Sequence, residues 1–155
     1  MSLLISILLR YPEAGSVRYV PQSNAINFIF LFTNEEDIQE SILEKLPLAL
    51  DVYHRLEERK MRLCQVEIQR EEGIGKLSIT RDVESITQGE VGLIVEMVKG
   101  ELGTNILCDE MELPEEEMVY QEEMIGHMLD TMRNVEIDKN VIALREEGKV
   151  LLFKV

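Results

Sequence analysis

The sequence predicts a single α+β domain over residues 1–155, in which a largely antiparallel sheet of six or seven strands is packed by three or four helices. Three observations lead to this prediction. Several apolar segments are shorter than ten residues and rich in β-branched and aromatic side chains. Turn residues join these segments in pairs, and other segments place apolar residues at helical spacing behind clear start signals. A chain of 155 residues is long enough to bury one such core.

The first third of the chain is predicted to form strands. Residues 2–10 are nearly all apolar and run into Tyr-Pro-Glu-Ala-Gly, so we expect a strand that is covered on both faces and ends in a turn. Residues 16–20 return from that turn. Residues 25–32 alternate, so that three of the four phenylalanines share one face with Ile26. This alternation predicts a central core strand.

A helix is predicted next, over residues 33–60. Thr33 or Asn34 is placed to cap its start, and three acidic residues follow at the positive end of the helix dipole. The apolar residues at helical spacing define its predicted inner face: Ile38, Ile42, Leu46, Ala49, Tyr53 and Leu56. Pro47 has no N–H to donate, so a kink or a division into two helices is expected. His54 lies on the flank of this helix, where we expect an exposed imidazole that pairs with Glu58.

The remainder of the chain is predicted to form two hairpins and two helices. Alternation at 64–69 and 76–80 around a turn at 71–75 predicts one hairpin, and residues 140–155 around Glu-Glu-Gly predict the other. Thr87 and Glu90 form a capping box that opens a helix ending at Gly100 or Gly103. A further helix is predicted from about Pro114 to Arg133. Arg-Glu-Glu-Gly occurs in both hairpins, which indicates either an internal duplication or the ordinary composition of hairpin turns.

The charge of the chain argues against nucleic-acid binding and gathers in one region. The formal net charge is −14, which disfavours contact with phosphates. Residues 82–138 alone carry a net −14, whereas residues 54–81 and 139–155 each carry +2. Eight carboxylates with no intervening base form the densest stretch: Asp109, Glu110, Glu112, Glu115, Glu116, Glu117, Glu122 and Glu123.

This acidic segment, residues 109–123, is the predicted contact surface for a basic protein partner. The binding residues are expected to be Glu115, Glu116, Glu117, Glu122 and Glu123. Two alternatives remain open: an ordinary solvated acidic face, supported by the favourable position of carboxylates in a first helical turn, and a divalent-cation site. The calcium-loop pattern with its central glycine is absent from the sequence, and no metal or cofactor is predicted.

One further cluster of residues could form a metal site or an acid/base catalytic site. Glu123, His127 and Asp130 are spaced by four and three residues, so they share one face of the helix predicted at 114–133 and could serve as a metal or acid/base trio. The apolar residues of this helix fall on the opposite side, which predicts that the trio faces water. A trio on one helix also lacks the second element that most hydrolase sites use.

The familiar catalytic and phosphate-binding motifs are missing from the sequence. Cys64 is expected on the core face of its hairpin and Cys108 has no base nearby in the sequence, so neither is a good candidate nucleophile. Five of the eight methionines lie in or just before the helix at 114–133. A methionine-rich helix face of this kind either packs in the core or forms a surface that adapts to a partner, including a second copy of the chain.

The resulting functional hypothesis is a small interaction or regulatory protein. Two cysteines and the lack of a signal-peptide pattern predict free thiols in the cytoplasm, and no apolar stretch is long enough for a membrane helix. A homodimer is expected, because residues 2–9 and 25–32 are apolar on both faces and require cover on both sides of the sheet. The alternative is a metal-assisted hydrolase that uses the Glu123, His127 and Asp130 trio.

Overall fold

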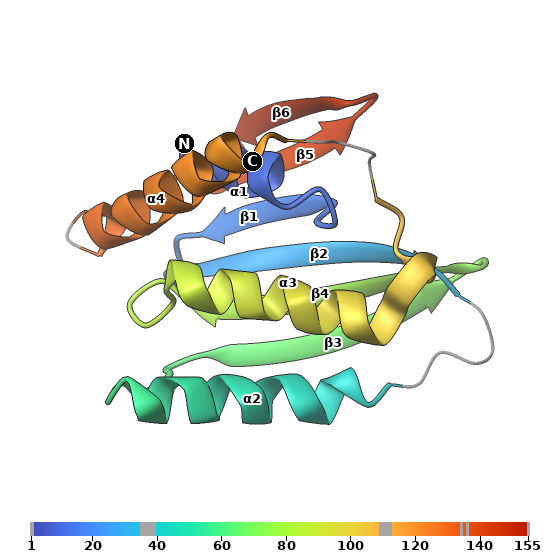
Figure 1. Ribbon diagram of the computed structural model, residues 1–155, viewed down its shortest axis with the longest axis horizontal. Helices are drawn as coiled ribbons and strands as arrows, with labels where there is room; N and C mark the ends of the chain where they lie inside the picture. The colour runs from blue at the N-terminus through green and yellow to red at the C-terminus, as the bar shows by residue number, and fades with distance from the viewer. Residues whose placement is uncertain (1, 35–39, 109–112, 134, 136, 155) are drawn as a thin grey trace.

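In the part of the chain that the structure describes, six strands form one antiparallel sheet and four helices lie on one side of it (Figure 1). The structure is a computed structural model that describes residues 2–34, 40–108, 113–133, 135 and 137–154. The strands are β1 (Ser16–Val20), β2 (Ala25–Thr33), β3 (Cys64–Glu71), β4 (Ile74–Asp82), β5 (Val141–Glu146) and β6 (Lys149–Lys154). The helices are α1 (Ser2–Arg10), α2 (Ile42–Leu56), α3 (Gln88–Leu102) and α4 (Glu115–Met132), with a 3-10 turn at η1 (Gly103–Asn105). The predicted α+β fold is therefore confirmed.

The sheet has the order β3-β4-β2-β1-β5-β6, so β2 is central as the alternation of its residues predicts. Its core face carries Phe28, Phe30 and Phe32, all fully buried. Gly75 of β4 lies opposite Phe32 in the ladder, and a Cβ atom on Gly75 would stand 2.1 Å from the Phe32 ring. Any residue other than glycine at position 75 would therefore place its side chain in the space that the Phe32 ring occupies.

Both predicted hairpins are present, and their turns are alike. Glu72 and Gly73 join β3 to β4 with positive φ angles of 44° and 80°, and Glu147 and Gly148 join β5 to β6 with 50° and 76°. Positive φ at both central residues is the pattern of the two-residue turns that match the twist of a hairpin. The repeated Arg-Glu-Glu-Gly is thus accounted for by turn geometry without requiring a duplication.

The prediction of a strand at residues 2–10 is wrong, because this segment is helix α1. Its buried residues include Leu3, Leu4, Ile7 and Leu8, which lie on one face of a helix. Six of the nine residues in this run are apolar, and their spacing fits either period, so the sequence pattern could not distinguish strand from helix. Packing decides for helix, since α1 lies against α4 and against β1, β5 and β6.

Helix α2 differs from its prediction in length and in its inner face. It begins at Ile42 and continues through Pro47 as one helix to Leu56, and residues 35–39, with the predicted Ile38, lie outside the described residues. Its buried face consists of Ile42, Leu46, Leu50 and His54. Leu56, predicted to face inward, is 80% exposed because the buried face follows His54 rather than Tyr53 and Leu56.

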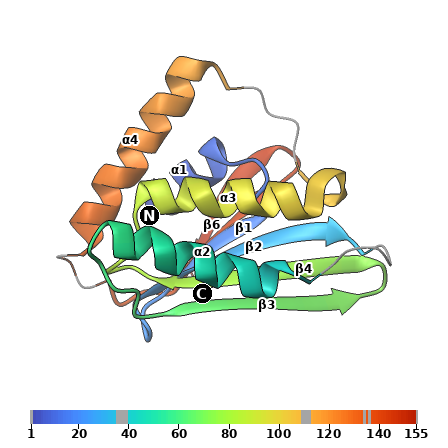
Figure 2. The same ribbon diagram turned by 60° about the horizontal axis from the view of Figure 1, so that its bottom comes forward.

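The later helices agree closely with the sequence. Thr87 caps α3 by accepting a hydrogen bond from the Glu90 N–H at 3.2 Å, and Gly103 ends the helix with a φ of 56°. Helix α4 runs from Glu115 to Met132. The helices lie on one side of the sheet, and the N-terminal turns of α4 project beyond the rest of the fold (Figure 2). Among the described residues, no helix combines the length and apolarity needed to cross a membrane.

Candidate functional site

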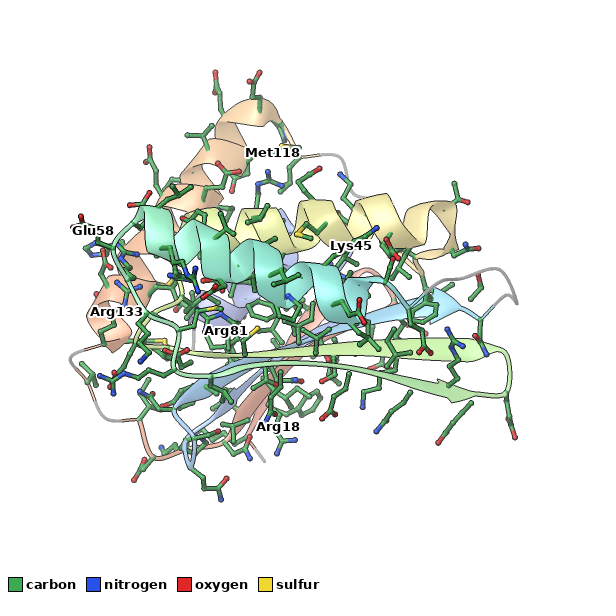
Figure 3. The ribbon with its side chains drawn as sticks, turned by 90° about the horizontal axis from the view of Figure 1, so that it is seen from below. Arg18, Lys45, Glu58, Arg81, Met118 and Arg133 are labelled. Atoms are coloured by element: carbon green, nitrogen blue, oxygen red, sulfur yellow. The ribbon has the colours of Figure 1, made fainter. Side chains whose placement is uncertain are left out.

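A cluster of charged side chains is buried where α2, β4 and the start of α3 meet. Arg81 and Glu90 are completely inaccessible to water, and His54 is 1% exposed. Asp82 and Ser85 complete the cluster and are also buried. Figure 3 shows Arg81 between the helices and the sheet. Burying a charged side chain costs free energy unless the charge is paired and hydrogen-bonded. The contacts of Arg81 therefore explain how the cluster is stable.

All five N–H donors of Arg81 are used. Nε donates to Glu90 Oε2 at 2.6 Å, and Nη2 donates to Glu90 Oε1 at 2.9 Å, which makes a bidentate pair. Nη2 also donates to Ser85 Oγ at 2.8 Å, while Nη1 donates to the Leu63 carbonyl at 2.6 Å and to Asp82 Oδ1. Burial alone would lower the pKa of Arg81, but Glu90 and Asp82 raise it above its ordinary value. Arg81 is therefore charged in the folded protein.

Asp82 holds the segment that precedes β3. Its Oδ1 accepts the backbone N–H groups of Leu63 at 2.9 Å and Arg62 at 3.1 Å, and its Oδ2 accepts the Ser85 N–H at 3.0 Å. Burial raises the pKa of Asp82, but the hydrogen bonds from Leu63 and Ser85 and the charge of Arg81 together bring it below the ordinary value. These contacts stabilise the ionised carboxylate.

His54 contradicts its prediction. The imidazole is buried rather than exposed, and it pairs with Glu90 instead of Glu58. A carboxylate can only accept, so Nε2 donates to Glu90 Oε1, and Nε2 also lies 3.1 Å from Arg81 Nη2. Nδ1 has no hydrogen-bond partner among the described residues. The helical spacing that assigned Tyr53 to the core could not anticipate that a charged partner from α3 would draw His54 inward.

The second half of the predicted capping box is also corrected. Glu90 was expected to reach back to the Thr87 backbone, but its carboxylate is taken up by Arg81 and His54. A signal for this cluster was present in the sequence. Leu77, Ile79 and Arg81 have the same parity along β4, which places an arginine on the core face. Because the cluster is sealed from solvent, it ties α2, β4 and α3 together and offers no group to a ligand.

A cavity of about 310 Å³ opens next to this cluster. Its walls come from the end of α2, the start of α3 and the second half of α4, with these lining residues: Tyr53, Glu57, Arg59, Thr87, Gln88, Gly89, Gly126, Leu129, Asp130 and Arg133. The Tyr53 hydroxyl lies 2.9 Å from Thr87 Oγ1. Two acidic and two basic side chains line the cavity, so it has no net charge and does not select an anion or a cation by Coulombic attraction.

The predicted trio of Glu123, His127 and Asp130 lies on the exposed face of α4. Only Asp130 reaches the cavity, where its carboxylate is paired with Arg133. Arg133 also donates to the carbonyls of Val83 and Ile86, which fixes its position. Within the described part of the chain, no group of three or more His, Cys, Asp or Glu side chains is arranged to hold a metal ion.

The acidic segment divides into two kinds of carboxylate. Glu122 pairs with Arg10 of α1 at 2.7 Å, and Glu117 accepts from Gln121 at 3.0 Å, so both serve contacts within the fold. Glu115, Glu116 and Glu123 are exposed. Asp109, Glu110 and Glu112 lie outside the described residues. The outward-facing part of the predicted contact surface is thus carried by α4.

The outer face of α2 carries a feature that the sequence reasoning missed. Leu48, Val52 and Leu56 are 65%, 55% and 80% exposed, and their spacing of four residues aligns them in one row. We call these three residues the α2 row. Lys45 and Arg55 lie beside the row on the same exposed side of the helix. The row was hidden in the sequence because an alternative inner face that includes Leu56 has the same helical period.

Cys64 is a half-buried free thiol, and Cys108 is exposed. Burial raises the pKa of Cys64, so its thiol is protonated at neutral pH and is a poor nucleophile. Comparison of this chain with protein-family models, with curated proteins and with solved structures finds no match.

Proposed function

We propose that this chain is a small cytoplasmic interaction or regulatory protein whose contact surface is formed by the outer faces of two helices, α2 and α4. The observation that carries the proposal is the α2 row, in which three large apolar side chains of one helix face water. Single exposed apolar residues are common on soluble proteins, but an aligned group of three marks a surface that is covered when the protein acts.

Helix α4 supports the same proposal. Val119 and Tyr120 are 47% and 53% exposed, and they lie beside the exposed carboxylates of Glu116 and Glu123. An amphipathic surface of this kind fits a partner that offers apolar side chains together with basic ones. The expected partner is therefore a basic protein surface, in agreement with the charge of residues 109–123.

The hydrolase alternative receives less support. A site built on Glu123, His127 and Asp130 requires all three side chains in one cleft with an acidic group from another element. The 310 Å³ cavity contains Asp130 and, from the end of α2, Glu57, but neither Glu123 nor His127 lines it. Glu90 is completely buried, does not line this cavity, and is paired with Arg81 and His54.

Site-specific photo-crosslinking in the source cell tests the proposal. A photoreactive amino acid is placed at Val52, at Val119 or, as a matched control, at Gln69, an exposed polar residue of β3. We expect discrete protein adducts from positions 52 and 119 and none from position 69. Equal, diffuse labelling from all three positions would show that the two helix faces are ordinary solvated surface.

A further inference from the structure

Strand β6 forms one edge of the sheet, beyond β5 (Figure 1). Among the described residues, β5 is the only strand that pairs with β6. We propose that the free edge of β6 binds an extended segment of a partner protein that is apolar in the middle and acidic at both ends. This edge is separate from the outer faces of α2 and α4, so the inference does not rest on the proposed function.

The turn between β5 and β6 determines which backbone groups of β6 face the free edge. Glu147 and Gly148 form a two-residue turn with positive φ angles of 50° and 76°, so the flanking residues Glu146 and Lys149 form a hydrogen-bonded pair. Hydrogen-bonded and non-hydrogen-bonded pairs alternate along an antiparallel ladder. The residues of β6 whose N–H and C=O groups point away from β5 are therefore Val150, Leu152 and Lys154.

The middle of β6 is apolar and is exposed on both faces of the sheet. Residues 150–153 are Val-Leu-Leu-Phe. Leu152, on the face that carries the helices, is 38% exposed, and Phe153, on the opposite face, is 46% exposed. Ile142 of β5 lies opposite Phe153 on that open face and is half-buried. A strand added at this edge would cover apolar side chains with both of its own faces.

The other edge of the sheet, β3, is protected in a way that β6 is not. Polar residues alternate along β3, and its open face carries Gln65, Glu67 and Gln69. A charged side chain in the middle of an edge strand opposes the addition of another strand. On β6 the charged residues stand only at the two ends, as Lys149 and Lys154, and the four residues between them are all apolar.

The two lysines give the edge a positive charge. Both are exposed, and neither forms an ion pair within the described part of the chain. Acidic residues are near but not on the edge strand: Glu146 lies opposite Lys149 on β5, and Glu147 lies in the turn. Helix α1, which also packs against β6, contains no acidic residue.

Distance makes the lysines the charges that an added strand meets first. A side chain of that strand would lie about 5 Å from its neighbour on β6 and roughly twice as far from β5. A six-residue segment with a carboxylate at each end places one carboxylate beside Lys149 and the other beside Lys154. The net charge of −14 opposes an acidic segment at long range, but the Debye length of about 8 Å at 0.15 M ionic strength largely screens this repulsion.

Charge also distinguishes a partner segment from a second copy of this chain. A second β6 would bring two more lysines to the pairing and no carboxylate. Like charges on neighbouring strands are destabilising, whereas opposite charges stabilise the pair. The chemistry of the edge therefore favours a different strand, with acidic ends, over another β6.

Peptide binding tests the inference. The probe is a fluorescein-labelled peptide, Glu-Val-Ile-Val-Ile-Glu, and its matched control is Lys-Val-Ile-Val-Ile-Lys. Fluorescence anisotropy at about 0.15 M ionic strength measures both affinities. We expect saturable binding of the acidic peptide to the wild-type protein, and a dissociation constant at least about tenfold higher for the basic peptide.

A charge swap on β6 should reverse this preference. The variant with Lys149→Glu and Lys154→Glu should bind the basic peptide at least about tenfold more tightly than the acidic one. The matched control carries Lys45→Glu and Lys76→Glu, at exposed positions on α2 and β4, and should keep the wild-type preference. Circular dichroism confirms that the variants are folded.

Leu152→Pro tests the use of the backbone. The N–H of Leu152 points outward, so proline removes a donor to the added strand without removing a hydrogen bond to β5. Leu152→Thr keeps this donor. We expect the proline variant to bind the acidic peptide at least about tenfold more weakly than the wild type, and the threonine variant less than about threefold more weakly. If the proline variant is unfolded, the charge swap alone decides.

Four results would overturn the inference. Neither peptide binding to the wild-type protein would show that the edge accepts no such strand. Equal binding of the two peptides would show that the lysines do not select the partner. Undiminished binding to a folded Leu152→Pro variant would show that the backbone edge is not used. A wild-type dimer in light scattering that Leu152→Pro separates into single chains would show that a second copy occupies the edge.

Discussion

The positively charged guanidinium group of Arg81 is buried away from water, and its hydrogen-bond partners determine how much this burial costs in folding free energy. The guanidinium group donates to two carboxylates, one hydroxyl and one carbonyl, so none of its N–H groups is left without an acceptor. Such an arrangement offsets the cost of desolvation only while all the partners remain. The same low-polarity surroundings make the loss of one partner expensive, because the remaining charge cannot return to water.

We therefore expect Glu90→Gln to destabilise the fold strongly. The substitution removes the charge that faces Arg81 and His54, and breaking a buried pair typically costs about 3–5 kcal/mol. The free energy of unfolding in urea measures this loss. Glu96→Gln is the matched control, since Glu96 is exposed on the same helix and its replacement should change the free energy of unfolding by less than about 0.5 kcal/mol. Equal effects at the two positions would contradict the role assigned to the cluster.

Asp82 leads to a prediction about acid stability. Its pKa is lower in the folded chain than in the unfolded chain, so its contribution to stability is present above the unfolded value of about 3.9 and is lost as the pH falls through the folded value. The free energy of unfolding should decrease as the pH is lowered below about 5. Asp82→Asn should be less stable at pH 7 and should show a shallower decrease in this range. Parallel pH profiles for the two proteins would contradict the prediction.

At the scale of elements, α2 and β4 show how neighbours select between local alternatives. The helical period of α2 permits more than one inner face. The face that includes His54 is selected because His54 contacts Glu90 and Arg81 in the folded chain. On β4, Gly75 leaves the space that the Phe32 ring of β2 occupies. In both elements, a side chain from another part of the chain completes the packing.

The Gly75 site can be tested with a matched pair of glycines. Gly75→Ala should destabilise the protein by about 1–3 kcal/mol, because the new methyl group would overlap the Phe32 ring and force β2 and β4 to shift. Gly100→Ala should instead stabilise it by about 0.5–1 kcal/mol, since Gly100 lies in α3 with open space around its Cβ position. Thermal or urea unfolding of the two variants distinguishes these opposite signs. Destabilisation by Gly100→Ala as well would indicate a general intolerance of added volume.

At the scale of the whole molecule, charge is distributed unevenly. Residues 82–138 carry a net charge of −14, which equals that of the whole chain, because the −4 of residues 1–53 is balanced by +2 in each of the segments 54–81 and 139–155. Carboxylates of like sign on neighbouring turns of α4 repel one another in the folded state, and this repulsion is reduced when the chain unfolds and expands.

Added salt should therefore raise the melting temperature. We expect an increase in Tm at pH 7 between about 10 mM and about 300 mM NaCl, because the Debye length falls from about 30 Å to below 10 Å over this range. A variant with Glu115→Gln, Glu116→Gln and Glu123→Gln should show a smaller increase, since it removes part of the repulsion. The measurement is differential scanning calorimetry at one protein concentration. A Tm that does not respond to salt would mean that the charges are too widely separated to interact.

The sequence by itself determined the features that a few neighbouring residues decide. The two hairpins, the cap at Thr87, the span of α4 and the buried phenylalanines of β2 were all predicted, and the structure confirms them. Turn conformations, caps and alternation depend on interactions within one or two turns of chain. The exposure of Glu123, His127 and Asp130 was predicted in the same way, from the helical period of a well-marked helix.

Only the tertiary structure decided the features that depend on contacts between distant residues. Residues 2–10 form a helix because α4 and the sheet offer a surface that suits one, and the nine-residue run itself satisfied either period. His54 and Glu90 are 36 positions apart, and no local pattern links them. The exposure of Leu56, which the helical period alone placed on the inner face, follows from their pairing, because the buried face of α2 ends on His54. Burial of a charge is decided by which partners the whole fold brings within reach, and a sequence read in short windows does not contain that information.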